Sequence, residues 1–518
     1  MTSFGRQITN LAARDPDGLA FVHVATDGTD TDVSWSELER RSNQVARLLA
    51  SRGVGADPDR SDLVAVALAN LPEHFYATYG VWKLGATVLP LRWDLPSWER
   101  DRLLDLAAPA AVVGNWDDAP VLRSGTQPDR TVTLDDLRAS VDLDDAPLPD
   151  RVPDPAQALA TSGSTGRPKL IIAPGRGEIE DITSVAPGSE IGEVAKQLVV
   201  SPLYHTNGFA CHMWLQGGRP LVVIEKFDAE RVVDAIERHR TNYTIMVPTM
   251  LQRIARLDGI EARDLSSLQS VLYGAAPIPE WVVRAWFDLV GPEHFHFSYG
   301  GTERFGIVTC TGVEWLEHPG TVGLPQGREL RILDEDGTEL PPGEVGEIFL
   351  RSTIPGPTAE YVGAAPAKGT DDGFHSYGDM GSVDEDGFLY IADRRVDMII
   401  TGGANVWPAE VEAALTEHAG VRDAVVIGVT DPEWGRRVHA IVEPADPASP
   451  PSDDELRAHC RERLTAYKVP KTFEIWGEGA LRTAAGKVNR SALVAEREPA
   501  PDPQPAERPP SPAAGRGG

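Results

Sequence analysis

The sequence predicts an α/β protein: a large N-terminal part of parallel-sheet βαβ units with a small β-barrel, followed by a small mobile α+β part. Three observations lead to this expectation. Strand-like and helix-like patterns alternate through the first 300 residues, hairpin-like patterns follow them, and a second set of helix and strands comes last. The 518 residues are 41% apolar and 25% charged, which is enough apolar material to pack several cores.

The alternation begins with a buried strand pattern at 63–69, a helix pattern at 72–85 and another strand pattern at 86–91. The same order returns within 220–248 and within 270–301. Strands separated by amphipathic helices are typical of right-handed βαβ units, which build largely parallel sheets.

Beyond residue 320 the sequence pattern changes to that of short strands and turns, as in 331–352 and 382–395. These segments predict the barrel. From about Asp397 a helix pattern and two strand patterns predict the smaller α+β unit. The last twenty residues are rich in proline and have little to bury, so we expect them to be disordered. The expected divisions are therefore residues 1–395, 396–498 and 499–518.

The net charge is −29, which disfavours nucleic acid and anionic membranes as partners because like charges repel. The cysteines Cys211, Cys310 and Cys460 lie far apart and show neither disulfide nor metal spacing. The sequence has no signal-peptide pattern and no apolar run of about 18 residues for a transmembrane helix. We therefore expect a cytoplasmic protein that binds any phosphate ligand through local amides and a few placed cations.

The segment 161–169, TSGSTGRPK, has the composition of a phosphate-binding loop. Small residues let backbone N–H groups approach phosphate oxygens, hydroxyls add donors, and a lysine adds a point charge. The segment cannot be aligned with the Walker pattern, and an ordinary Ser/Thr/Gly turn is the alternative. The candidate residues are Thr161, Ser162, Gly163, Ser164, Thr165, Gly166 and Lys169.

This segment is followed, in order, by YGGTE at 299–303, YGD at 377–379, DR at 393–394 with MIITGGANVWPAEVE after it, and TAAGKVNR at 483–490. Each is a weak to moderate signal alone, but five in order over more than 300 residues form a strong one. The chain resembles the adenylate-forming superfamily, in particular the acyl-CoA synthetases of the bile-acid and fatty-acid CoA ligase branch. The resemblance runs from about residue 25 to 495.

The resemblance implies an ATP-dependent acyl-CoA synthetase that uses Mg²⁺ and coenzyme A. A carboxylate attacks the α-phosphate of ATP and expels pyrophosphate, and the CoA thiol then displaces AMP from the acyl-adenylate. Negative charge builds on the phosphoryl oxygens in the first step, so positioned cations are needed rather than an acid–base pair.

In the family pattern, Glu303 holds Mg²⁺, Thr302 contacts phosphate, Tyr299 frames the adenine, and Asp379 and Arg394 bind the ribose. Each has a plain alternative: a buried or surface glutamate, a strand-end turn, a turn aspartate, a surface arginine. The backbone beside Tyr299 is expected to add a flat wall to the adenine site, through Gly274, Ala275, Ala276 and Gly300.

Lys487 is expected to bridge the substrate carboxylate and the α-phosphate, with a solvated lysine as the alternative. For the second step, the C-terminal part is expected to swing about Arg395 and Val396. That swing would bring a glycine-containing loop toward a CoA tunnel, with a simple turn as the alternative. The loop residues are Gly402, Gly403 and Ala404. Val396 departs from the family, which usually has a polar residue at this position.

The segment 201–217 is expected to line the acyl pocket and contains no acidic residue, which favours an acid without an ammonium group. His205 resembles the gate between this pocket and the CoA tunnel, with a structural histidine as the alternative. A bulky, polycyclic or terpenoid acid is the preferred substrate. The candidate pocket residues, for which plain core packing is the alternative, are Tyr204, His205, Phe209, Met213, Trp214 and Gly301.

Two competing functions stay open. A stand-alone adenylation enzyme would load a separate carrier protein, since no carrier-serine motif lies in the C-terminal region. A non-catalytic descendant would bind nucleotide only, but such a protein would not need Lys487, Glu303, Asp379 and Arg394 together. A homodimer is also left open.

Overall fold

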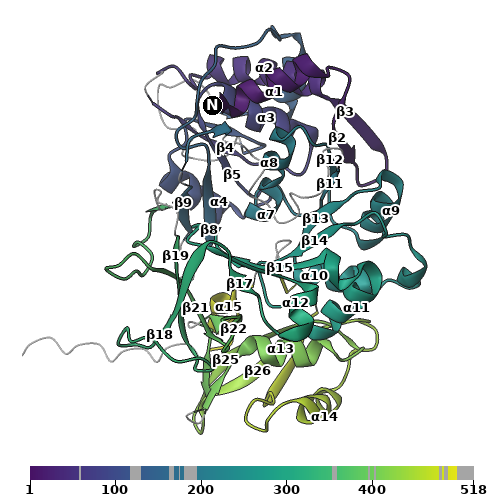
Figure 1. The fold of residues 1–518 in the computed structure, drawn as a ribbon, viewed down its shortest axis with the longest axis vertical. Helices are drawn as coiled ribbons and strands as arrows, with labels where there is room; N and C mark the ends of the chain where they lie inside the picture. The colour runs from purple at the N-terminus through teal and green to yellow at the C-terminus, as the bar shows by residue number, and fades with distance from the viewer. Residues whose placement is uncertain are drawn as a thin grey trace, which may run out of the picture.

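The computed structural model describes residues 1–57, 60–116, 130–162, 168–173, 175–179, 195–352, 359–394, 397–401, 404–477, 481–482 and 488–498. The α/β class is confirmed, and Figure 1 shows the α1–α3 region at one end of the molecule and α13 and α14 at the other. Within the described residues, no helix combines the length and apolar character needed to cross a membrane.

The largest sheet of the described part has nine strands and a parallel centre, with antiparallel strands at both edges. Its strands in spatial order are β17 (Leu324–Pro325), β16 (Ile307–Thr311), β15 (Phe295–Gly300), β14 (Ser270–Tyr273), β13 (Tyr243–Met246), β11 (Gln197–Val199), β12 (Leu221–Ile224), β2 (Leu19–Val24) and β3 (Asp30–Ser34).

Helices connect the central strands as the alternating pattern predicted. They are α9 (Ala229–His239), α10 (Pro248–Ala255) and α11 (Glu280–Val290). The Asp228 side chain accepts a hydrogen bond from the Arg231 backbone N–H at 3.0 Å and so caps α9. The apolar face of α9, with Val232, Val233 and Ile236, is fully buried.

A second parallel sheet contains the two strands of the first predicted βαβ unit. Its order is β5 (Thr87–Pro90), β4 (Leu63–Val66), β6 (Ala111–Val113), β7 (Thr131–Val132). Other described helices near it or at the chain start are α1 (Phe4–Arg14), α2 (Trp35–Ser51), α3 (Pro72–Lys83), α4 (Ser97–Ala107) and α6 (Leu134–Ala139). Gly85 has φ +72° just after α3, a conformation that glycine adopts without strain.

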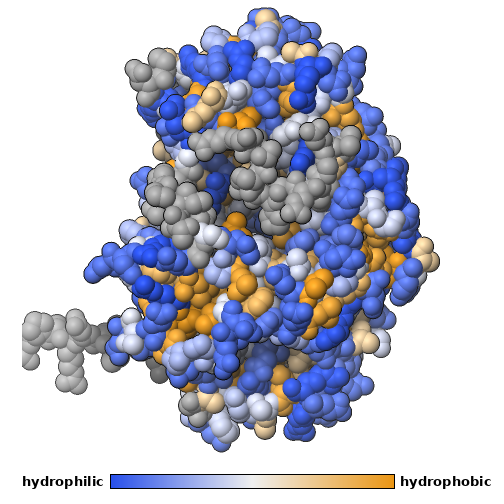
Figure 2. Space-filling view, in the orientation of Figure 1, coloured by the Kyte–Doolittle hydropathy of each residue, from blue (hydrophilic) through white to orange (hydrophobic). Residues whose placement is uncertain are grey.

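Two larger antiparallel sheets complete the described N-terminal part, beside a two-stranded one formed by β1 (Thr2–Ser3) and β10 (Glu178–Ile179). One has the order β18 (Arg328–Leu333), β19 (Gly346–Ser352), β21 (His375–Val383), β22 (Leu389–Arg394), in the region where the barrel is expected. The other has the order β20 (Glu360–Val362), β9 (Pro168–Ile172), β8 (Ala158–Ser162). Most of the face seen in Figure 2 is hydrophilic, with apolar residues gathered around its middle height.

The C-terminal part packs its own apolar core on a sheet. The sheet contains β24 (Ala404–Val406), β23 (Ile399–Thr401), β26 (Gly435–Pro444), β25 (Val421–Asp431) and β27 (Thr472–Ile475), and its helices are α13 (Pro408–Thr416), α14 (Asp453–Arg463) and α15 (Arg490–Ala495). The expected boundary at residues 395 and 396 and the tail from residue 499 lie outside the described residues, so the division into domains stays a prediction.

Backbone carbonyls of the C-terminal part accept hydrogen bonds from the end of α10. Arg256 donates to the carbonyl oxygens of Val421 at 2.8 Å and Thr416 at 2.7 Å. Gln252 donates to the carbonyl oxygen of Arg422 at 3.0 Å. These contacts hold the two parts together in this structure.

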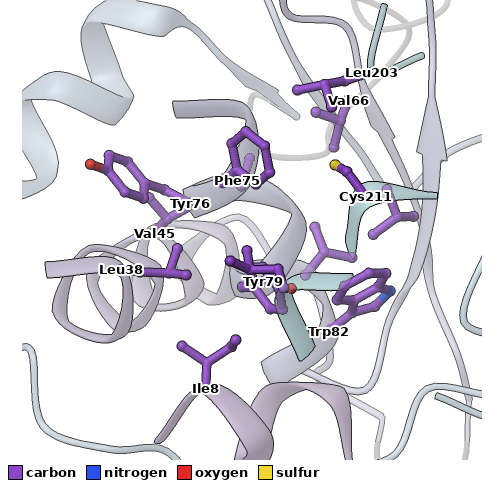
Figure 3. Packing of buried hydrophobic residues seen from close by; sticks show 14 of the residues in the cluster. Ile8, Leu38, Val45, Val66, Phe75, Tyr76, Tyr79, Trp82, Leu203 and Cys211 are labelled. Carbon is purple, nitrogen blue, oxygen red and sulfur yellow. The ribbon is translucent and has the colours of Figure 1, made fainter. Parts of the chain in front are cut away.

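The core between α1–α3 and the nine-stranded sheet is strongly aromatic (Figure 3). Two histidines are buried within it, His74 of α3 and His212 of α8 (Cys211–Gln216), with ring centroids 6.4 Å apart. Among the described residues, no group is hydrogen-bonded to either ring nitrogen of His212. Burial lowers the pKa of His74 to about 3 and the pKa of His212 well below its ordinary value.

We expect the free energy of unfolding to fall as the pH drops below about 6.5, because the unfolded chain then protonates both imidazoles and the folded chain does not. Each buried histidine contributes about 1.4 kcal/mol per pH unit in that range. His212→Phe keeps an aromatic ring among Phe209 and Trp82, so it should reduce this slope by about one proton. Urea unfolding between pH 7 and 4.5 measures it, and an unchanged slope would contradict the assignment.

Candidate active site

The segments that the sequence singled out meet where three sheets adjoin. β15 ends at Gly300 and leads into Thr302 and Glu303, β9 carries Lys169, and β21 carries Asp379. The nine-stranded sheet supplies the first segment, the three-stranded sheet the second and the four-stranded antiparallel sheet the third. The fold therefore brings together residues that are more than 200 positions apart.

Glu303 lies at the centre of this arrangement. Its Oε1 is 3.2 Å from the Lys169 Nζ, and its side chain is 13% exposed against 24% for the lysine. The Tyr361 hydroxyl donates to the same oxygen at 2.7 Å, and the Lys169 ammonium lies 4.3 Å from the Tyr361 ring centroid. The carboxylate is thus held by a cation and a hydroxyl donor in a partly buried position.

Tyr361 was not among the sequence candidates. It reaches the site because β20 pairs with β9, which places Tyr361 opposite Ile171, two residues from Lys169 and on the same face of the strand. Burial and the neighbouring Glu303 carboxylate raise the pKa of Tyr361, so it stays a neutral donor. A strand of three residues gives too short a pattern to predict such a pairing.

The nucleotide candidates Tyr299 and Asp379 are in direct contact. The Tyr299 hydroxyl donates to the Asp379 Oδ2 at 2.9 Å, which fixes the aromatic ring beside the carboxylate. In the pairing of β21 with β22, Asp379 lies opposite Arg394. The backbone therefore places Arg394 next to Asp379, as expected for two residues that bind one sugar.

Two of the site's backbone positions are strained. Ala275 has φ 79° and Arg304 has φ 59°, and they are two of four non-glycine residues with clearly positive φ in the described part of the chain. Such conformations cost of order 1–3 kcal/mol and concentrate at ligand sites. Ala275 lies within the expected adenine wall, and Arg304 directly follows the metal candidate Glu303.

Two glycines among the site candidates leave little or no room for a side chain. A Cβ on Gly301 would lie 2.4 Å from the Tyr377 ring and 2.8 Å from the Glu303 Oε2. A Cβ on Gly274 would lie 3.0 Å from the Ser298 carbonyl oxygen. A side chain at position 301 would therefore displace either the aromatic ring or the carboxylate.

The acyl-pocket segment approaches the same place. The rings of Tyr204 and His205 lie 4.6 Å apart, and the Thr206 hydroxyl is 3.2 Å from the Thr302 hydroxyl. His205 occupies the N-cap position of α7 (Thr206–Phe209), with no capping hydrogen bond from its side chain. The gate candidate thus directly precedes a helix whose first residue contacts the nucleotide segment, and its role stays a prediction.

Three other pocket candidates are placed differently. Phe209 and Trp214 are buried in the aromatic core, where Trp214 stacks on Tyr243 at 5.0 Å and Phe209 packs 4.6 Å from His212. Met213 is 41% exposed. Phe209 and Trp214 therefore occupy the core positions that the sequence left open as their alternative.

Several candidates lie outside the described residues: Gly163, Ser164, Thr165, Gly166, Arg395, Val396, Gly402, Gly403 and Lys487. For Thr161, Ser162 and Arg394 the structure describes the backbone, which forms β8 and β22. Ala404 begins β24 and is half-buried.

The site offers oxygen ligands that suit Mg²⁺ brought in with a polyphosphate. Among the described residues, no cluster of three or more His, Cys, Asp or Glu side chains could hold a metal ion. Glu303 offers one carboxylate and Thr302 one hydroxyl, which are the hard oxygen donors that Mg²⁺ takes. Mg²⁺ commonly binds through one or two carboxylates, with water and substrate phosphates completing its octahedron.

The Glu303–Lys169 and Tyr299–Asp379 pairs thus lie where the sheets adjoin, and the fold together with the ordered motifs points to an adenylate-forming enzyme. The comparisons with known proteins agree. The family described as AMP-binding enzyme matches residues 8–361, and its C-terminal domain matches residues 410–487. The chain belongs to the AMP-binding enzyme family.

Its relatives place it in the acyl-CoA ligase branch, as the motifs predicted. A feruloyl-CoA synthase of Amycolatopsis is 33% identical over 88% of this chain and 92% of its own length. A 2-succinylbenzoate–CoA ligase of Bacillus licheniformis is 32% identical over 90% and 95%, respectively. A fatty acid–[acyl-carrier-protein] ligase of Streptomyces coeruleorubidus is 31% identical over 89% and 91%.

Solved structures share the fold. The o-succinylbenzoate CoA synthetase of Bacillus subtilis in complex with ATP and magnesium ion has a TM-score of 0.76 and 27% identity, covering 94% of this chain and 98% of that one. The complex of the same enzyme with its acyl-adenylate intermediate has a TM-score of 0.77. The likeness extends over both the N-terminal and the C-terminal part.

Proposed function

We propose that the chain is an AMP-forming acyl-CoA synthetase with ATP, Mg²⁺ and coenzyme A as its co-substrates and cofactor. A carboxylate oxygen of the acid attacks the α-phosphorus of ATP and pyrophosphate leaves with the bonding electron pair. The CoA sulfur then attacks the acyl carbon and AMP leaves. The observation that carries the proposal is that the Glu303–Lys169 and Tyr299–Asp379 pairs both lie where the three sheets adjoin.

In the first step the chain binds and orients the nucleotide. Asp379 is proposed to accept hydrogen bonds from the ribose hydroxyls, and Tyr299 is proposed to offer its ring to the base; the hydrogen bond between the two side chains supports a shared site. Lys169 can move from Glu303 to a phosphate oxygen when nucleotide enters, because the two sites compete for one ammonium. Glu303 and Thr302 would hold Mg²⁺, which when bound supplies neutralising charge at the phosphates.

Lys487 and the hinge complete the proposal. The Lys487 ammonium is proposed to meet the α-phosphate in the first step. A swing about Arg395 and Val396 then replaces it with the loop at Gly402–Ala404 for the second step. The family's C-terminal match covers the segment up to residue 487, which supports this assignment.

The acid is proposed to be bulky, largely apolar and free of an ammonium group. The structure adds one acidic group near the pocket segment, Asp94, which together with Arg92 interacts with Tyr204. Arg92 donates two hydrogen bonds, of 2.5 and 2.9 Å, to the Asp94 carboxylate. Because this carboxylate is already paired with a cation, it is not free to bind the ammonium group of a substrate. A polycyclic or terpenoid acid remains the preferred substrate, and the names of the relatives add aryl acids as the rival class.

Pyrophosphate release across a panel of acids, with and without CoA, tests the proposal. The panel contains a polycyclic terpenoid acid, ferulate, 2-succinylbenzoate, a straight-chain fatty acid and an amino acid. We expect the preferred acid to exceed the others by about 10-fold or more in kcat/KM, as pocket selection typically gives. Turnover with aryl or straight-chain acids alone would refute the terpenoid preference, and no release with any acid would count against the synthetase itself.

A carrier protein is the second candidate acceptor. The relative named as a fatty acid–[acyl-carrier-protein] ligase favours it, since that enzyme covers nearly the same length of chain. Consumption of the acyl-adenylate by CoA alone supports the synthetase. Consumption only after addition of a carrier protein with its phosphopantetheine arm supports the ligase.

A further inference from the structure

A buried network in the C-terminal part joins two arginines to one carboxylate. Glu412 of α13 accepts from the Arg482 Nη2 at 3.0 Å through Oε2 and from the Arg490 Nη2 at 2.6 Å through Oε1. Its side chain is 9% exposed, and those of the arginines are 16% and 18% exposed. The backbone N–H of Val426 donates to the same carboxylate at 2.8 Å.

Each arginine has further partners that fix its direction. The Arg482 Nε donates to both oxygens of Asp423 at 3.1 and 3.0 Å, and its Nη2 also donates to the Ala424 carbonyl. The Arg490 Nη1 donates to the Asp397 Oδ2 at 3.3 Å. Both guanidinium groups therefore span two carboxylates, a geometry that a planar fork supports and an ammonium does not.

The two arginines flank one short stretch of chain. Arg482 precedes and Arg490 follows residues 483–487, which end at Lys487. The neighbouring side chains are also held, since Leu481 is buried and Val488 packs against the same apolar cluster. The residues on both sides of the segment are thereby bound to the Glu412 carboxylate. Through Arg490 the network also includes Asp397, the residue directly after the expected hinge.

Stability alone is a weak explanation for this network. Burying charged groups costs several kcal/mol each, and well-packed apolar residues of similar volume are often at least as stabilising. What the charges add is geometry, because charge-assisted hydrogen bonds to a shared carboxylate fix the distance between its two donors.

We propose that Glu412, Arg482 and Arg490 form a clamp that positions Lys487 for the adenylation step. The three are positioning residues, since they act through the lysine. The inference rests on the proposed function. It explains why the arginines on both sides of the lysine's segment bind the same carboxylate, that of Glu412.

Arg490→Lys tests the clamp because it keeps the positive charge beside Glu412 and removes the fork that reaches Asp397. We expect kcat for ATP–pyrophosphate exchange to fall by about 10- to 100-fold, as small misplacements of catalytic groups typically cause. KM for ATP should stay within about two-fold, because Lys487 is proposed to stabilise charge that develops on the α-phosphate only as the first step proceeds. Thioester formation from synthetic acyl-adenylate and CoA should also stay within about two-fold, because the second step does not use Lys487. Arg463→Lys is the matched control, since Arg463 pairs with Glu417 at 2.7 Å on the surface of the same part.

Thermal unfolding of both variants is measured alongside the two half-reactions. If Arg490→Lys does not fold, Asp397→Asn at the edge of the network gives the same readout with a smaller change. Unchanged exchange, or an equal fall in both half-reactions, would overturn the clamp while the wild type still supports the proposed function. Absence of exchange in the wild type overturns the proposed function and the clamp together.

Discussion

Lys487→Ala is expected to slow adenylation by about 10²-fold or more, since removal of one preorganised charge donor typically costs that much. The lysine is proposed to stabilise charge that develops on the α-phosphate only in the first step. Thioester formation from a preformed acyl-adenylate should therefore continue at close to the wild-type rate. ATP–pyrophosphate exchange and single-turnover thioester formation measure the two steps separately.

Lys368→Ala is a suitable control for this variant. Lys368 is a half-exposed lysine that pairs with Glu347 at 2.7 Å, and it takes no part in the proposed chemistry. It should leave both rates unchanged. If Lys487→Ala adenylated the acid as fast as this control, the assignment of the lysine would be wrong.

Glu303→Gln is expected to lower adenylation by about 10²- to 10³-fold, the loss typical of removing one group that stabilises transition-state charge. The amide keeps the size of the side chain but loses the charge that attracts both Lys169 and a divalent cation. A second readout is independent of turnover: Mn²⁺ binding in the presence of ATP, followed by electron paramagnetic resonance, should weaken in the variant.

Tyr361→Phe is the matched comparison for Glu303→Gln. It removes the hydroxyl that donates to the Glu303 Oε1 at 2.7 Å and leaves the carboxylate in place. Loss of one such hydrogen bond should lower the rate by only about 2- to 10-fold. Equal effects of the two substitutions would mean that the carboxylate itself contributes no charge to the reaction.

The sequence predicted the architecture well where the pattern repeats. The strand at 270–273 and the helix after Pro279 follow directly from alternating apolar runs and a helix-start signal. Tyr299 and Asp379 belong to two short motifs that the sequence assigned to one nucleotide site, and the structure brings the two side chains into contact. Their role in nucleotide binding stays a prediction.

Residues that act through pairing across the chain were not predictable. Tyr361 enters the site through a three-residue strand, and Arg490 meets Glu412 from 78 positions away. Phe209 and Trp214 illustrate the opposite problem. The sequence pattern of an apolar residue on a short helix is the same whether the residue lines a pocket or fills a core. Only the structure distinguishes the two, through the packing of Phe209 on His212 and of Trp214 on Tyr243.

The contact of Arg256 and Gln252 with the C-terminal part has a consequence for engineering. Every acceptor in it is a main-chain oxygen, so no side-chain substitution in the C-terminal part deletes an acceptor. A C-terminal part taken from a relative would accept the same hydrogen bonds from Arg256 and Gln252 as long as its backbone follows the same path. Hybrids that combine N-terminal and C-terminal parts from different members of this family should therefore keep these hydrogen bonds without redesign of the interface between the parts.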